Sequence, residues 1–432
     1  MNNNRIAFKN LMVLTSIFIF LVLTASAQSD KAYRIQDDVY ARSIQTVRLQ
    51  RLGYEMSFPV INFNSDEQLK LTFDDLDGDI KYFRYTFVHC DALWNLSDLW
   101  QSDYISGFPD DMINNYQSSF NTIQPYTHYE LIFPNDNFNF ILPGNYLLIV
   151  FNDNNPDDVV LTRRFSVVDM KVSIDGFIRT PKTISERNQK QEIGFTVNAN
   201  KYPLSDISRN LKVIIKQNCR WDNELYLQPY QTNGSILDFR FPDGSNTFYG
   251  VNEFRTLDLR SLKYKSKNIR DFERDNDGYH FYLWPDQIKT TKPYIFEQDL
   301  NGRYQILAEN SSDPAIDAEY VYVYFSLPFE QVPDADVYVT GMLADWQFRD
   351  QNKMYYNARR SAYELRMYLK QGFYNYHYAL LKKDSQNGDP GYFEGNHTET
   401  GNEYTVYVYY REPSARYDIL IGVKTFNSKD YL

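Results

Sequence analysis

The chain has 432 residues, a formal net charge of −11 and an aromatic content of 17%. At roughly 100–200 residues per domain, this length exceeds one small β-domain and suits two to four domains. The negative charge repels phosphate backbones, which excludes nucleic acid as a partner. Aromatic side chains favour pleated, half-buried surfaces, so the 37 Tyr and 30 Phe residues predict an all-β protein.

The amino terminus has the pattern of a secretory signal peptide. Arg5 and Lys9 precede an apolar run over residues 11–23, and Ala25 and Ala27 supply the small residues of a cleavage site. We therefore expect cleavage after Ala27, which removes two positive charges and leaves an exported, soluble chain of charge −13. An uncleaved anchor would lack this cleavage pattern. No second apolar run reaches the roughly 20 residues that span a bilayer.

The rest of the chain alternates short strand patterns with turn residues at spacings of about ten residues, as β-sandwiches do. We predict three consecutive β-sandwich domains of the immunoglobulin-like or E-set-like type. Their predicted boundaries are 28–169, 170–314 and 315–432. No long Pro/Ser-rich linker separates them, so we expect the domains to pack against one another.

An acidic turn stands out in the first domain. Asp77 and Gly78 supply the Asp-Gly pair typical of a β-hairpin, which here would join strands at 68–73 and 82–89. The alternating Asp75, Asp77 and Asp79 also resemble the start of a calcium loop. The glutamate that such a loop needs farther on is absent, so the hairpin is the favoured interpretation.

Two charged stretches in the predicted second domain are candidate binding sites. In the first, Arg220, Trp221 and Asp222 interrupt the strand pattern, where they can form a stacked and hydrogen-bonded corner that holds a loop. The second, over residues 252–264, has a period of two that places an acid and an arginine on one face of a strand.

These acid and arginine pairs are Glu253 with Arg255 and Asp258 with Arg260. Arginine can present its planar fork to a carboxylate or to backbone carbonyls. The favoured interpretation is a structural brace that fixes strand register. The alternative is a surface for a partner protein, with the candidate contact residues Arg220, Trp221, Arg255 and Arg260.

Enzyme signatures are absent from the sequence, which has no Gly-x-Ser-x-Gly elbow, HExxH, CxxC or phosphate loop. None of the five histidines has another four residues away, the spacing of a helical metal pair. We predict no catalytic residues, no metal and no cofactor, although two carboxylates that meet only in space would suit a glycosidase. Cys90 and Cys219 fall in different predicted domains, so we expect two thiols rather than a disulfide.

Two segments near the carboxyl terminus read VYVTGMLADW (337–346) and KQGFYNYHYALL (370–381). Together they resemble a glycogen-binding module of the E-set type. In such modules a tryptophan after the turn stacks on a sugar ring, a role that would fall to Trp346. The loop over 382–403 offers no second tryptophan, so the resemblance implies a reused fold more than a reused site. A glycan-binding accessory protein is therefore the alternative function.

A closer resemblance runs through the whole mature chain. It rests on long stretches in a fixed order, beginning with SFPVINFNSDEQLKLTFDDLDGDIKYFRYTFVHCDALW (57–94) and SFNTIQPYTHYELIFPN (119–135) and continuing with LTRRFSVVD, QNCRWDN, NEFRTLDLRSL, DLNGRY and KQGFYNYHY. These stretches resemble the type IX secretion system plug protein family of Bacteroidetes. The resemblance implies a non-enzymatic periplasmic protein at the inner face of the outer membrane. Its partner would be the large outer-membrane β-barrel translocon, whose periplasmic opening it closes when no substrate is carried.

Overall fold

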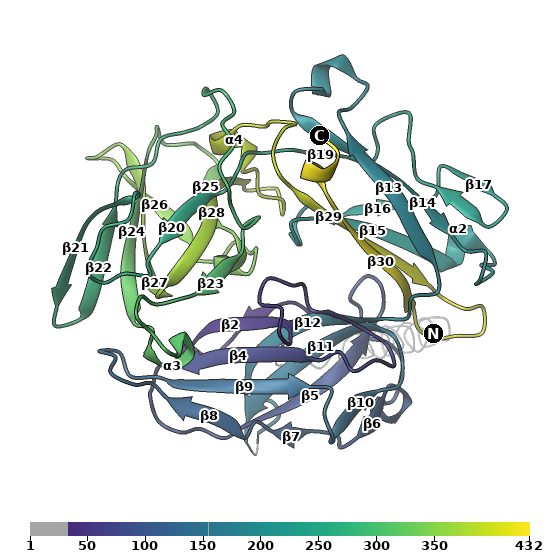
Figure 1. The fold of residues 1–432 in the computed structure, drawn as a ribbon, viewed down its shortest axis with the longest axis horizontal. Coiled ribbons are helices and arrows are strands. Elements are labelled where there is room, and N and C mark those ends of the chain that lie inside the picture. The colour runs from purple at the N-terminus through teal and green to yellow at the C-terminus, as the bar shows by residue number, and fades with distance from the viewer. Residues whose placement is uncertain (1–32, 154) are drawn as a thin grey trace, which may run out of the picture. The chain divides into compact units, whose positions relative to one another are not determined.

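The structure is a computed structural model that describes residues 33–153 and 155–432. Within them, Ile35–Leu432 form one compact unit. Strands dominate this unit and form six sheets (Figure 1), which confirms the prediction of an all-β sandwich protein. The signal peptide predicted for residues 1–27 lies outside the described residues.

Helices are few and short in the described chain. None is longer than four residues, and none could span a membrane. The helices are α2 (Ile207–Asn210), α3 (Pro314–Asp317) and α4 (Gly391–Glu394), with 3-10 turns η1 (Gln101–Asp103), η2 (Ile184–Glu186), η3 (Met342–Ala344) and η4 (Ser428–Asp430).

Two sheets and a two-stranded ribbon form the first sandwich. Alternate residues of its strands point into one core rich in phenylalanine and tyrosine, as the period of a half-buried strand requires. One sheet has the order β1 (Asp38–Val39), β12 (Val159–Val168), β11 (Gly144–Asn152), β5 (Phe83–Cys90) and β7 (Asp111–Met112), with β3 (Val60–Asn62) also on β12. The other has β2 (Ile44–Arg51), β4 (Leu69–Asp75), β9 (Thr127–Phe133) and β8 (Asn115–Ser118), and the ribbon pairs β10 (Phe138–Phe140) with β6 (Ile105–Gly107).

The predicted hairpin at Asp77 and Gly78 is wrong. A turn forms there, but β4 pairs with β2 and β9 while β5 pairs with β11, so the turn carries the chain from one sheet to the other. Turn residues specify that the chain reverses, and they do not specify which strands pair. The ammonium of Lys81 lies among the three carboxylates that resemble a calcium loop, 2.7 Å from Asp75 and 4.0 Å from Asp79.

The second sandwich encloses a core of mainly aliphatic residues with Phe195, Phe239 and Tyr404. Its first sheet has the order β13 (Ser173–Arg179), β14 (Lys190–Asn198), β18 (Ile236–Asp238) and β17 (Gln231–Asn233), with β19 (Thr247–Tyr249) also on β14. Its second sheet has the order β16 (Leu225–Leu227), β15 (Leu211–Gln217), β29 (Glu403–Tyr410) and β30 (Ile419–Asn427).

A nine-stranded sheet surrounds the third core, to which both its early and its late strands contribute residues such as Leu257, Val323 and Tyr378. Its order is β20 (Arg255–Asp258), β28 (Gly372–Lys382), β25 (Ala335–Thr340), β26 (Lys353–Asn357), β27 (Ala362–Lys370), β24 (Tyr320–Pro328), β22 (Gly278–Leu283) and β21 (Ile269–Asp275), with β23 (Tyr304–Ile306) also on β28.

The sheets do not follow the predicted boundary at residue 314. Strand β20 precedes this boundary but pairs with β28, from Arg255 opposite Tyr376. Strand β29 follows it but pairs with β15, from Leu211 opposite Tyr410, and Figure 1 shows yellow β29 and β30 beside teal β15. The chain thus leaves the second sandwich, builds the nine-stranded sheet and returns. Strand pairing over such sequence separations leaves no mark in local periodicity.

Candidate functional site

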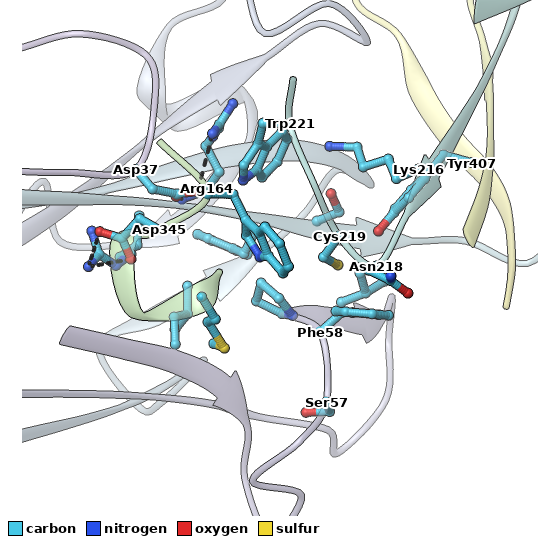
Figure 2. Close-up of a pocket in the computed structure, with 18 of the residues that line it drawn as sticks. Asp37, Ser57, Phe58, Arg164, Lys216, Asn218, Cys219, Trp221, Asp345 and Tyr407 are labelled. Atoms are coloured by element: carbon cyan, nitrogen blue, oxygen red, sulfur yellow. Dashed lines mark hydrogen bonds and ion pairs between the residues drawn. The ribbon is translucent and has the colours of Figure 1, made fainter. Parts of the chain in front are cut away.

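A central cavity of ≈ 110 Å³ lies where the two sandwiches and the nine-stranded sheet meet (Figure 2). The first sandwich contributes Phe58 and Trp94, and the second contributes Trp221 and Tyr407. Trp346 reaches the cavity from the segment that follows η3. The cavity is therefore the point at which sequence-distant parts of the chain touch, and each part supplies an aromatic side chain.

Four cationic side chains also line the central cavity, and each is paired with a carboxylate. Burial of the Lys216 ammonium lowers its pKa to about 8, although the neighbouring Glu224 opposes this shift. Because each positive charge is matched, the cavity does not present a net charge that would attract an anion. The pairs are Arg163 with Asp345 at 3.2 Å, Arg164 with Asp37 at 3.2 Å, Lys216 with Glu224 at 2.7 Å, and Arg303 with Glu403.

Trp221 is held between two of these cations. The Cζ of Arg164 lies 3.2 Å from the centre of the Trp221 ring, and the Nζ of Lys216 lies 3.1 Å from it (Figure 2). Trp94 meets the same ring edge-on at 5.5 Å. Cations that lie over a tryptophan ring interact favourably with it. Trp221 therefore stabilises the contact between the two sandwiches and does not present its ring on a free surface.

Arg220 forms the predicted corner with Asp222. Its Nε and Nη2 donate to the two carboxylate oxygens at 2.9 and 2.8 Å, and Nη2 also donates to the carbonyl of Gly388 at 3.1 Å. Gly388 follows β28 of the nine-stranded sheet, whereas Arg220 follows β15 of the second sandwich. The corner therefore joins two sheets, and only 9% of Arg220 is exposed.

Arg255 is buried at the edge of the nine-stranded sheet, with 7% exposed. It does not pair with Glu253. Its guanidinium instead lies 2.9 Å from both Glu394 and Asp286 and donates to the carbonyl of Gln287 at 2.7 Å. Burial disfavours the charge, but the two carboxylates more than compensate and raise the pKa of Arg255.

Among the four candidate partner contacts, Arg260 has the most exposed side chain, at 50%. It forms the predicted pair with Asp258 at 2.6 Å. Since Arg220 and Arg255 are almost completely buried and the ring of Trp221 is covered, these candidates do not form one surface.

Trp346 is 7% exposed and offers no open ring face to a sugar. Its ring lies edge-on to Phe254 at 5.9 Å. Gly302 packs so closely that a Cβ there would come within 2.2 Å of the indole. The stacking role that the module resemblance suggested for Trp346 is therefore not available in this arrangement.

A second buried ion pair joins the first sandwich to the nine-stranded sheet. Asp74, at the end of β4, accepts hydrogen bonds at 2.6 Å from Lys370 and from the Tyr320 hydroxyl, and its other oxygen lies 2.6 Å from Nδ1 of His128. Burial would raise the pKa of Asp74, but Lys370 and His128 hold it below its ordinary value.

Sequence reasoning missed the pair of Asp74 and Lys370. Lys370 stands in phase with Tyr368 rather than with the core residues of β27, so its position looks solvent-exposed. The face it occupies is covered by another sheet, which local sequence does not reveal. The only signals of this pair in the sequence are that Asp74 lies near the end of one strand and Lys370 at the end of another.

The described residues around the central cavity do not bring reactive groups together. Cys219 lines the central cavity, and burial raises the pKa of its thiol to about 12, which keeps it protonated and a poor nucleophile. No disulfide joins Cys90 and Cys219 in the described chain. Over residues 33–153 and 155–432 no cluster of three His, Cys, Asp or Glu side chains is arranged to hold a metal.

The structure defines a class of protein. It is an all-β protein of several packed sheets, in which buried charged side chains connect the two sandwiches and the nine-stranded sheet. Residues 44–169 match the family described as type 9 secretion system plug protein, first domain. The chain belongs to the type IX secretion system plug protein family, which is a family of secretion-system components and not of enzymes.

A solved structure supports the same fold over almost the whole chain. It is the crystal structure of a hypothetical protein from Parabacteroides merdae, with a TM-score of 0.89 and 33% sequence identity. The match covers 91% of this chain and 100% of the other. A comparison with curated proteins finds no match.

Proposed function

We propose that the protein is a periplasmic plug that binds the outer-membrane translocon of the type IX secretion system. In this role it closes the periplasmic opening while no substrate is carried. The observation that carries the proposal is the family match over residues 44–169. The role requires no catalysis, metal or cofactor.

The buried ion pairs between sheets support this role physically. A plug must keep its shape against a wide pore, and packed interiors resist deformation. Asp74 with Lys370 joins the first sandwich to the nine-stranded sheet, and Asp418 joins the two sandwiches by accepting from the Ala92 amide at 3.0 Å and from Lys212 at 2.7 Å. Loss of one partner from such a pair is costly, so the sheets should move as one body.

Removable closure calls for an interface of moderate size with a few aromatic or arginine anchors. Buried Arg220 and Arg255 do not suit that role, and Arg260 remains accessible. The first sandwich also exposes large aromatic side chains, including Trp100 at 80% and Phe120 at 71%. We expect the translocon to contact exposed side chains of this kind.

Outer-membrane permeability tests the proposal. Deletion of the gene should increase entry of large antibiotics or dyes, and expression of the intact protein should reverse the increase. A strain that also lacks the translocon serves as the control, because no pore then remains to be closed. Unchanged permeability in the deletion strain, with the translocon present and its other partners removed, would contradict closure.

Association can be tested separately from closure. Tagged protein purified from detergent-solubilised outer membranes should bring down a very large β-barrel.

The alternative glycan-binding function is tested by electrophoresis in gels containing starch or glycogen. We expect no retardation, because Trp346 is covered, and retardation lost in Trp346→Ala would favour the glycan function instead.

A further inference from the structure

The outer face of the nine-stranded sheet carries a grid of tyrosines. Strand register places Tyr282 beside Tyr324 and Tyr324 beside Arg366, in one row across β22, β24 and β27. The next row holds His280, Tyr322 and Tyr368. Farther along the same face, Tyr320 and Lys370 are covered by the first sandwich through Asp74. The end that carries Tyr282, Tyr324 and Arg366 is open.

At this open end the tyrosine rings cover one another. The rings of Tyr282 and Tyr324 stack at 4.7 Å with an angle of 20° between their planes. His280 and Tyr322 stack similarly at 5.0 Å and 22°. Such stacking covers ring faces and leaves ring edges, while the hydroxyl of Tyr282 donates to Glu273 at 2.6 Å and that of Tyr324 lies 3.0 Å from Nδ1 of His280. Sugars need open ring faces, whereas the ring edge is the positive part of the aromatic quadrupole and favours negative groups.

Two exposed arginines stand at the ends of the first row. The Cζ of Arg366 lies 4.9 Å from the centre of the Tyr322 ring, and that of Arg270 lies 5.9 Å from the Tyr282 ring. Arg270 occupies a bulge in β21 beside Tyr282. Neither guanidinium forms a salt bridge with a carboxylate of the described chain, which sets them apart from the arginines of the central cavity.

Three carboxylates near these arginines have other partners, whereas Asp350, which lines the same groove, is exposed and forms no salt bridge among the described residues. Asp271 pairs with Lys265 at 2.7 Å, and Glu364 pairs with Arg360 at 2.9 Å. Glu273 accepts from the Tyr282 hydroxyl at 2.6 Å. Arg270 and Arg366 are thus left with positive charge directed to solvent, on a protein whose net charge is −11.

An open groove of ≈ 910 Å³ is lined by the first row and its two arginines, namely Arg270, Tyr282, Tyr324 and Arg366. Tyr355 on its wall is 62% exposed and offers an apolar anchor. Three strand-to-strand steps separate Arg270 from Arg366, which corresponds to about 14 Å at the usual strand spacing. An extended polypeptide covers that distance in about four residues.

We propose that this groove binds an acidic polypeptide segment of a partner protein. The segment lies across β27, β24 and β22, with one carboxylate on Arg366 and a second, about four residues away, on Arg270. An apolar side chain of the same segment, outside this pair on the Arg366 side, packs against Tyr355 on β26. Charge complementarity selects an acidic occupant, and the stacked rings exclude a glycan platform. The inference goes beyond translocon closure, because it requires only this face.

A defined probe tests the site on the purified mature chain. The probe is a fluorescein-labelled ten-residue peptide with two glutamates four residues apart, a phenylalanine two residues outside each glutamate, and glycine and serine elsewhere. Binding is followed by fluorescence anisotropy at low salt. The double variant Arg270→Glu/Arg366→Glu should weaken binding at least about tenfold, because it places like charges together. Replacement of both peptide glutamates by glutamine should weaken binding to a similar extent.

Arg187→Glu is the matched control, because Arg187 is exposed on the second sandwich and distant in sequence from the groove. Its affinity for the peptide should equal that of the wild type. A second variant, Tyr355→Ala, removes the apolar anchor without a change of charge and should weaken binding severalfold. Urea unfolding confirms that each variant is folded. Absence of peptide binding, equal loss in Arg187→Glu, or equal binding of the glutamine peptide would overturn the proposal.

Discussion

Arg255 and Arg366 both lie beside a tyrosine ring of the nine-stranded sheet, at 5.2 Å from Tyr378 and 4.9 Å from Tyr322. Their surroundings differ. Arg255 is 7% exposed and contacts two carboxylates and a carbonyl, whereas Arg366 is exposed and has no salt bridge among the described residues. Burial of an unpaired charge is costly, so a buried arginine comes with its partners. The exposed one keeps its charge available for another molecule.

This contrast separates two uses of the same residue type. Arginines inside the molecule stabilise the contacts between sheets, and their removal should affect folding. Arginines on the tyrosine face should affect binding and leave folding nearly unchanged. An arginine motif in the sequence therefore identifies a functional surface only when its exposure and its partners are known.

The largest expected effect is on folding, from Glu394→Gln. Glu394 is fully buried, pairs with Arg255 at 2.9 Å and accepts from the Tyr378 amide at 3.0 Å. The amide would direct N–H groups toward the guanidinium and leave its charge poorly compensated. We expect the free energy of unfolding to fall by about 3–5 kcal/mol, as measured by urea denaturation.

Glu364→Gln is the matched control for Glu394→Gln. Glu364 is the same residue type and also pairs with an arginine, Arg360, but that arginine side chain is 72% exposed. Its change should cost no more than about 1 kcal/mol. Equal effects of the two substitutions would refute the distinction between buried and exposed pairs.

A smaller but pH-dependent effect is expected from Asp74→Asn, which breaks the buried pair with Lys370. The substitution keeps the size of the side chain and its contacts with Tyr320, so we expect a loss of about 3 kcal/mol at neutral pH. Asp334→Asn is the control, because that carboxylate is exposed where it meets Lys383. It should change the urea midpoint far less.

The pH dependence follows from the lowered pKa of Asp74 in the folded protein. The unfolded chain binds a proton at the ordinary aspartate pKa of about 3.9, before the folded protein does. The stabilisation is therefore complete above that pH and is lost as the pH falls through the folded pKa. The difference between wild type and Asp74→Asn should be constant from pH 7 to about pH 5 and shrink below about pH 4. A difference that grew on acidification would contradict this assignment.

Strands were the part of the fold that local pattern could predict. The alternating run YTVYVYY over 404–410 predicts a strand, and the structure has β29 (Glu403–Tyr410) there. Its partner could not be predicted. β29 pairs with β15, which lies almost two hundred residues earlier in the chain. Such pairing depends on the shape of the core and on which sheet edges are available, and neither is visible in local sequence. The prediction of a hairpin at Asp77 and Gly78 was wrong for the same reason, because turn residues do not determine which strands pair.

Prediction of the site was limited by burial. The corner of Arg220 with Asp222 follows from their spacing alone, since both partners are local. Arg255 was expected to meet Glu253 two residues away, but Glu394 is its partner, and no periodicity connects positions so far apart. Trp346 fits a sugar-binding motif in sequence, yet its ring packs against Phe254 and Gly302. Residue identity predicted the chemistry of these positions but not their accessibility.

The smallest expected effect comes from Arg260→Ala, which refines the comparison between Arg255 and Arg366. Arg260 resembles Arg366 because half of its side chain is exposed. It resembles Arg255 because it has a carboxylate partner, Asp258, at 2.6 Å. Exposed pairs contribute little, so the free energy of unfolding should change by no more than about 1 kcal/mol. Its charge is compensated and lies away from the groove, so the affinity for the glutamate peptide should stay within about twofold of the wild type. Weaker peptide binding in Arg260→Ala would mean that exposure alone, and not an unpaired charge beside stacked tyrosines, determines where acidic segments bind.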